Sequence, residues 1–255
     1  MAKNFIIHSP EEINAIRVAA QAAAFVREQL VSIAVPGMST KELDDIAGTL
    51  IASRGGKSAF LGYRGYPGQT CISLNDKVVH GIGSPSEIMR DGDVVSVDIG
   101  VNIAGGIGDT AKSFVVGARP FPDITMLLEK TEEALMAGIS AALKGNYIRN
   151  ISAEIEKIAR KAGLGIVREY VGHGCGTKLH EPPEIPNFVT GNRGPMLMPG
   201  MVLAIEPMLN LGTHKVYTEP DNWTVRTLDG KVSAHFEHTV LITDNQPEIL
   251  TWLKT

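Results

Sequence analysis

Four carboxylates and one imidazole along this chain are suited to binding metal ions. Two of the carboxylates, Asp98 and Glu206, each follow a run of predominantly apolar residues. Side chains in a strand alternate between its two faces, so each carboxylate is expected at the end of a buried strand. Burying an unpaired carboxylate is costly, so each needs a cation, which is either an arginine or lysine partner or a metal ion.

Asp109 follows Asp98 by eleven residues, across a glycine-containing turn at residues 102–106. In an antiparallel hairpin centred between Ile103 and Ala104, Asp98 and Asp109 stand directly opposite each other. Like charges in that position are destabilising, and a divalent ion between them would offset the repulsion.

His173 and Glu237 complete the set. His173 lies among three glycines, which let the backbone pass close to another segment, and Glu237 lies on an expected strand. Oxygen-rich ligand sets with one nitrogen suit divalent first-row metals. Four carboxylates exceed what one ion usually needs, so we expect two ions about 3.5–4 Å apart.

Each of these residues also has an ordinary structural explanation. An aspartate such as Asp109 after a turn is often a cap, and a glutamate at a strand end is often paired with a cation. A histidine among glycines, such as His173, is commonly a loop residue. The combined pattern, and no single residue, favours a metal site.

The other histidines differ in their settings. We expect His8 and His214 on the surface, and His238 on the strand face opposite Glu237. His235 shares the face of Glu237 and is expected beside the cleft.

The elements that must position these residues follow a pattern that occurs twice, with two helices before a group of strands. Ser9 and Ser39 each have a glutamate three residues later, which predicts a capping box. The expected helices run from Pro10 to about 33, from the Ser39 cap to about 54, over 123–143, and from an Asn150 cap to about 161. The first expected strands are residues 70–74, 78–79, 94–99 and 110–116, with a loop at 63–67.

The two halves also resemble each other in sequence. Residues 92–98 (GDVVSVD) match 200–206 (GMVLAIE), and residues 40–47 match 152–159. Matches in the same order indicate an internal duplication, with repeats at about 9–120 and 121–250. We expect one domain, residues 1–255, of the α/β (α+β) class, with an antiparallel sheet shared by both halves and helices on one face.

Composition narrows the class of protein. The formal net charge is −4, which gives no reason to expect a nucleic-acid partner. No apolar run approaches a transmembrane helix or a secretory signal, and two unrelated cysteines form no disulfide framework. We therefore expect a cytoplasmic protein without a membrane partner.

Several motifs occur in a fixed order along nearly the whole chain. They are NDKVVHG at 75–81, DVVSVD at 93–98, GDT at 108–110, GHG at 172–174, HEP at 180–182, AIEPM at 204–208 and FEHT at 236–239. Together they resemble a type I methionine aminopeptidase. This resemblance implies the duplicated pita-bread fold with pseudo-two-fold symmetry. It also implies removal of the initiator methionine from nascent chains whose second residue is small.

The resemblance assigns a role to each candidate residue. Asp98 would bind one ion, Asp109 and Glu237 would bridge both ions, and His173 and Glu206 would complete the second. Glu206 would also shuttle a proton, while His180 would bond the scissile carbonyl oxygen and His80 the scissile nitrogen. The methionine pocket would consist of Tyr63, Tyr66, Cys71, Leu179 and Trp223. A monovalent-cation site would use Asn75, Ser233 and the carbonyl of Lys77.

Some positions depart from the family pattern, so the sequence does not determine the shape of the methionine pocket. They are Val79, Gly83, Gly106, Leu179 and His235. The native metal also stays open among Co, Mn, Fe, Zn and Ni, because all tolerate this ligand set. Two alternatives remain: an X-Pro aminopeptidase, or an inactive binding protein on the same fold. The expected partners are nascent N-termini, with ribosome docking undecided, and the expected state is a monomer.

Overall fold

The structure is a computed structural model that describes residues 5–117 and 121–253. Within them lie four α-helices, α1 (Pro10–Ile33), α2 (Thr40–Ser53), α3 (Pro122–Ser140) and α4 (Ile148–Lys161), and a 3₁₀ turn at Tyr63–Gly65. The strands are β1 (Lys57–Ser58), β2 (Cys71–Leu74), β3 (Lys77–Val79), β4 (Val94–Ile103), β5 (Gly106–Val115), β6 (Gly165–Ile166), β7 (Gly172–Gly174), β8 (Glu181–Ile185), β9 (Val202–Ile205), β10 (Met208–Asn210), β11 (Val216–Thr218), β12 (Val225–Thr227), β13 (Ser233–His235), β14 (His238–Leu241) and β15 (Glu248–Ile249). Among the helices of the described residues, none has the length and apolar character needed to span a membrane.

The helix starts follow local capping chemistry. The capping boxes predicted at Ser9 and Ser39 are both present, so α1 and α2 begin where expected. The Asn150 cap was wrong, because α4 already begins at Ile148. Asn150 instead lies inside the first turn, where its side-chain oxygen accepts a hydrogen bond from the backbone N–H of Tyr147 at 2.8 Å.

The β4–β5 hairpin has a different register from the predicted one. Its turn consists of Ala104 and Gly105, both with positive φ, so Asp98 pairs with Ala111 and Asp109 pairs with Gly100. Two left-handed turn residues match the twist of a hairpin, which moves the centre of the hairpin by one residue. Asp98 and Asp109 are therefore diagonal neighbours on one face, and the predicted direct opposition was wrong.

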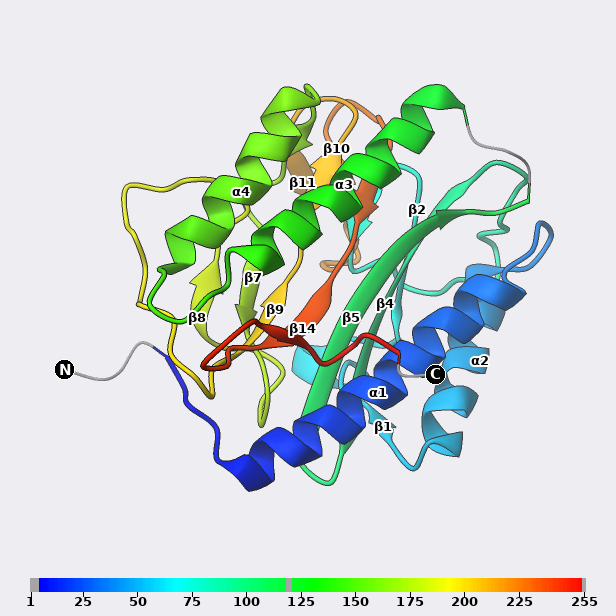
Figure 1. Ribbon diagram of the computed structural model, residues 1–255. Coiled ribbons are helices and arrows are strands. Elements are labelled where there is room, and N and C mark those ends of the chain that lie inside the picture. The colour runs from blue at the N-terminus through cyan, green and yellow to red at the C-terminus, as the bar shows by residue number, and fades with distance from the viewer. Residues whose placement is uncertain (1–4, 118–120, 254–255) are drawn as a thin grey trace.

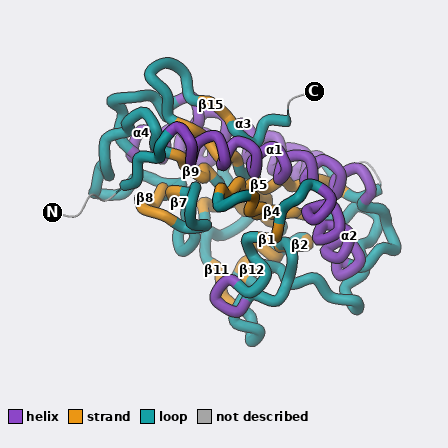
Figure 2. The backbone as a smooth tube through the Cα atoms, turned by 90° about the horizontal axis from the view of Figure 1, so that it is seen from below, coloured by secondary structure: helices purple, strands orange, loops and turns teal. Residues whose placement is uncertain are grey.

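The described strands pair only antiparallel and form four sheets. The two largest are the sheet β1-β4-β2, with β5 paired to β4, and the sheet β15-β14-β9-β7-β8. Strands β5 and β14 lie side by side in the middle of the molecule, with α1 and α3 across the same face (Figure 1). The smaller sheets are β13-β10-β6 and β11-β12-β3, and β11 and β12 lie on the side away from those helices (Figure 2).

The predicted α/β class, with antiparallel strands and helices over one face, is confirmed. The layer shared by both halves is made of the two larger sheets, which meet at β5 and β14. Each half has its own apolar core, one beneath α1 and α2 and the other beneath α3 and α4. The metal-ligand candidates lie near the line where the halves meet.

Helix α1 crosses β5 at very short distance. A Cβ added at Gly108 would be 2.2 Å from the Cα of Ala20, and one at Gly106 would be 2.3 Å from the backbone carbon of Ala15. The glycines of β5 and the alanine-rich face of α1 together permit this approach. The departure at Gly106 is thus explained by helix packing.

Candidate active site

The five predicted metal ligands line one cavity of about 610 Å³. Ligand atoms of Asp109, His173 and Glu237 lie within 4.8 Å of one another. His173 Nε2 is 4.0 Å from Asp109 Oδ2 and 3.4 Å from Glu206 Oε1. Asp98 joins the group from β4, beside Asp109.

Both larger sheets contribute to this cluster. Asp98 and Asp109 come from β4 and β5, and His173 comes from β7. Glu206 directly follows β9, and Glu237 directly precedes β14. The cluster therefore forms only when the two halves are together.

The glycines around His173 serve strand packing. A Cβ at Gly172 would lie 2.5 Å from the Ala204 oxygen, and one at Gly174 would lie 2.5 Å from the Pro182 oxygen. Strand β7 fits between β8 and β9 only because both positions lack a side chain. This packing fixes where His173 projects into the cavity.

Two threonines, the last residues of the GDT and FEHT motifs, were given no role from the sequence and join the sheets at the site. Thr239 Oγ1 donates to the Asp109 carbonyl at 2.7 Å and accepts from the Asp109 N–H at 3.0 Å. Thr110 Oγ1 donates to the Glu237 carbonyl at 2.8 Å, and the Glu237 N–H donates to the Ala111 carbonyl at 2.9 Å. Each threonine lies within two residues of one ligand and holds the backbone of the other.

Without a cation, the ionised form of these four buried carboxylates is energetically unfavourable. Burial raises the pKa of Asp98, Asp109, Glu206 and Glu237 above their usual values, and charge repulsion within the group raises those of Asp98, Glu206 and Glu237 further. A nearby cation opposes such shifts, as the positive charge of Arg27 does at Glu237, and the backbone hydrogen bond from Thr110 opposes the rise at Asp109.

The donor atoms fit divalent metal ions. Asp98 Oδ1 and Asp109 Oδ1 are buried and have no hydrogen-bond partner among the described residues. His173 Nδ1 donates to the Gly174 carbonyl at 2.9 Å, so Nε2 presents its lone pair toward the carboxylates. Burial also lowers the pKa of His173 to about 3, which keeps this lone pair free at neutral pH. A neutral imidazole nitrogen facing carboxylate oxygens calls for a cation between them.

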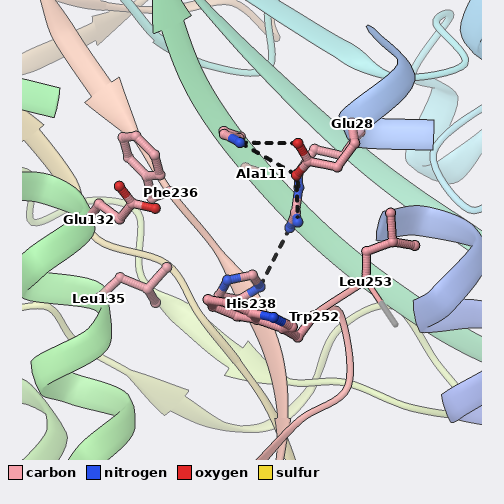
Figure 3. A pocket seen from close by; sticks show the side chains of 10 residues that line it. Glu28, Ala111, Glu132, Leu135, Phe236, His238, Trp252 and Leu253 are labelled. Atoms are coloured by element: carbon pink, nitrogen blue, oxygen red, sulfur yellow. Dashed lines mark hydrogen bonds and ion pairs between the residues drawn. The ribbon is translucent and has the colours of Figure 1, made fainter. Parts of the chain in front are cut away.

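Two further histidines near the ligands in sequence lie on opposite faces of the sheet. His235 Nε2 lies 3.3 Å from Glu206 Oε2, which agrees with its expected place beside the ligands. His238 faces the opposite side, where it lines a smaller pocket near Trp252 (Figure 3). Strand alternation accounts for both positions.

The predicted substrate residues line the same cavity as the carboxylates. The apolar members pack with Phe60, which the sequence analysis missed because it lies in no motif. His180 stacks on Tyr63 at 5.3 Å and lies 4.2 Å from the His173 ring, measured between ring centroids. His80 lies edge-on to Trp223, and burial lowers its pKa to about 4. The predicted pocket residues that the structure brings together are Tyr63, Tyr66, Cys71, Leu179 and Trp223.

The candidate monovalent-cation residues lie apart from this cavity. The Ser233 N–H donates to the Asn75 carbonyl at 2.9 Å, which brings these two together. The side-chain oxygen of Asn75 accepts from the Val94 N–H at 3.0 Å. The Lys77 ammonium pairs with Glu87 at 2.5 Å, and Lys77 follows Asn75 by two residues.

His8 is buried, and its expected surface position was wrong. It is 5% exposed, and its Nε2 lies 3.1 Å from Glu181 Oε2. The other oxygen of Glu181 accepts from the backbone of Thr177 and Lys178. The pair thus holds the loop that precedes His180 in place.

We predict that His8 stabilises the fold in a pH-dependent manner. Burial alone would lower its pKa, but Glu181 and Glu12 raise it above the usual value. A raised histidine pKa gives stability that is complete below about pH 6.5 and is lost as pH rises through the folded-state value. At pH 6, His8→Gln should therefore be less stable than the parent by about 1.5 kcal/mol or more. Thermal unfolding from pH 6 to 9 should show the gap shrinking, and a constant gap would contradict the pairing.

Comparison with known proteins identifies the family to which the chain belongs. The model for metallopeptidase family M24 matches residues 14–244, so the chain belongs to this family of metal-dependent peptidases. Divalent metal use follows from that membership and from the ligand cluster.

Within the family, the chain is similar in sequence over nearly its whole length to methionine aminopeptidases. The chain is 46% identical to methionine aminopeptidase 1 of Bacillus subtilis (strain 168) over 246 residues, which cover 96% of this chain and 98% of that protein. It is 41% identical to methionine aminopeptidase of Escherichia coli (strain K12) over 249 residues, covering 97% and 94%. The predicted resemblance to the type I enzymes is confirmed, and with it the assignment as a metal-dependent aminopeptidase.

Solved structures give the same fold. The crystal structure of methionine aminopeptidase from Thermotoga maritima matches with a TM-score of 0.94 at 38% identity, covering 97% of this chain and 99% of that one. Prolidase from Pyrococcus furiosus matches with a TM-score of 0.79 at 25% identity, covering 98% of this chain and 66% of that one. The predicted pita-bread fold is confirmed.

Proposed function

We propose that this protein removes the N-terminal methionine of nascent chains whose second residue is small, by hydrolysing the first peptide bond. The observation that carries the proposal is that the carboxylate cluster and the apolar pocket line one cavity. Such a cavity can hold an apolar side chain while the adjacent peptide bond lies against the cluster. The names of the similar proteins support methionine as that residue.

The metal centre is proposed to hold two divalent ions. Asp98 would hold one ion, and His173 and Glu206 would hold the other. Asp109 and Glu237 would be shared by both. When bound, the ions supply an activated water and positive charge for the developing oxyanion. Four carboxylates in one cluster support two ions over one.

The chain's own residues would orient the peptide and move the proton. Glu206 lies between His173 and His235, at 3.4 and 3.3 Å, and is placed to accept a proton from the attacking water and pass it to the leaving amine. His180, stacked on Tyr63, would bond the scissile carbonyl oxygen. His80 would bond the scissile nitrogen, and its lowered pKa keeps it neutral at pH 7.

The experiment removes metal with a chelator and restores one divalent ion at a time from Co, Mn, Fe, Zn and Ni. Turnover of Met-Ala-Ser should disappear with chelation and return with metal, at two ions per chain. Met-Phe-Ser should be cut far more slowly, because a narrow site would exclude a bulky second residue. Preferential cleavage of Ala-Pro peptides would make the protein an X-Pro aminopeptidase, and no turnover with any metal would make it an inactive binding protein.

The halves are proposed to be one duplicated domain, since Gly92 and Gly200 both have positive φ and each comes six residues before a carboxylate of the cluster. We place the protein in the cytoplasm as a monomer, where nascent chains emerge from the ribosome. Asn75, Ser233 and the Lys77 carbonyl are proposed as a monovalent-cation site.

A further inference from the structure

A buried arginine supports the junction between β5 and β14 from the helix side. Arg27 of α1 is 6% exposed, and its Nη1 donates to Thr110 Oγ1. Thr110 in turn donates to the carbonyl of Glu237 at 2.8 Å. A chain of two hydrogen bonds therefore connects Arg27 to the backbone of a proposed metal ligand.

The C-terminal segment provides a second support beside the first. Thr251 is fully buried, and its Oγ1 accepts from the Thr239 N–H at 3.1 Å. Thr239 is the residue whose hydroxyl holds both backbone groups of Asp109. Arg27 Nη2 lies 3.4 Å from the Thr251 carbonyl, so the two supports are themselves connected.

Burying the charge of Arg27 costs hydration free energy unless negative charges nearby compensate for it. Its nearest carboxylate is Glu28, at 2.9 Å, and Glu28 is shared with Lys112 at 3.1 Å (Figure 3). A buried apolar side chain in the same place would avoid the desolvation of a cation. Beyond Glu28, the negative charges of Glu237, across the sheet, and of Glu132 also favour the cation. This ties the arginine to the carboxylate cluster as well as to the packing of α1.

We propose that Arg27 and Thr251 form a clasp that positions Asp109 and Glu237 for metal binding. The inference rests on the proposed metal site and adds two positioning residues to it. The two ligands come from different sheets and repel each other, and side-chain hydrogen bonds from threonines join their strands. Without the clasp the strands separate more easily, so bound metal must supply the free energy that brings them together.

The test is calorimetric titration of Mn²⁺ into the chelated protein, with thermal unfolding of the metal-free state alongside. Arg27→Met should raise the Kd for Mn²⁺ by about tenfold or more, the range for losing a group that orients ligands. Arg17→Met is the matched control. Arg17 lies on the same helix, and its ion pair at 2.6 Å is with Glu248 of β15 rather than with Thr110 or Thr251. It should change the Kd by less than about twofold.

Two variants of Thr251 test the same proposal if Arg27→Met does not fold. Thr251→Val keeps the side-chain shape and removes the hydroxyl, so it should weaken Mn²⁺ binding, and Thr251→Ser should restore it. The clasp is disproved if Arg27→Met and Thr251→Val bind Mn²⁺ like the parent, or if Arg17→Met weakens binding equally. A parent protein that binds no Mn²⁺ would instead remove the proposed metal site itself.

Discussion

Replacing Asp109 by asparagine should lower kcat/KM on Met-Ala-Ser by at least about a thousandfold. The substitution removes one of the two carboxylates proposed to bind both ions. A catalytic metal contributes several kcal/mol to a hydrolysis, and each 1.36 kcal/mol is a factor of about ten in rate. A matched change, Asp45→Asn on the exposed surface of α2, should leave the rate within about twofold.

The same variant should be more stable than the parent when both are free of metal. Burial raises the pKa of Asp109, so its charge opposes folding in the metal-free protein. A raised carboxyl pKa means that the folded state binds more protons than the unfolded state, so stability falls as pH rises. The advantage of Asp109→Asn should therefore grow between pH 5 and 8, measured by thermal unfolding. Full turnover, or a metal-free variant less stable than the parent at pH 8, would refute this account of Asp109.

Gly174→Ala should destabilise the protein by about 3 kcal/mol, at the upper end for overpacking a tight site. The new Cβ would lie 2.5 Å from the Pro182 oxygen and 2.9 Å from the Glu181 oxygen. Both are backbone atoms, so strand β8 must move away from β7. For a chain of this size the melting temperature should fall by about 6–12 °C.

The shift of β7 should also weaken metal binding, because His173 directly precedes Gly174. Gly191→Ala is the control, since a Cβ there would meet nothing within 4 Å and the backbone has no positive φ. Thermal unfolding and Mn²⁺ titration of both variants provide the readouts. Equal melting temperatures would mean that β7 and β8 are not packed as the structure has them.

The parts of the fold that were predicted correctly depend on local chemistry. Ser9 and Ser39 cap their helices with residues three positions away, and such a signal is complete within one turn. Two of the ligand candidates, Asp98 and Glu206, could also be found, because each follows a glycine by six residues at the end of an apolar run. The exact pairing of β4 with β5 could not be predicted, because Ala104 adopts a positive φ that its residue type does not suggest.

The features that the sequence did not reveal depend on distant partners. His8 is buried against residues far along the chain, among them Glu181 and Gly176. Thr110 and Thr239 lie in the GDT and FEHT motifs, but the motifs do not show which backbone groups they bond across the β5–β14 junction, and Arg27 on α1 resembles any helix arginine. None of these contacts produces a regular spacing of residues in the sequence. They can be identified only in the folded structure, where the two halves are together.

We propose that five side chains from both halves hold a pair of divalent ions. Anomalous diffraction at the manganese edge, from crystals grown with Mn²⁺, tests it most directly. We predict two peaks about 3.5–4 Å apart. Asp109 and Glu237 should contact both, and Asp98, His173 and Glu206 should contact one each. Manganese bound elsewhere, or absent while the protein remains active, would contradict the account.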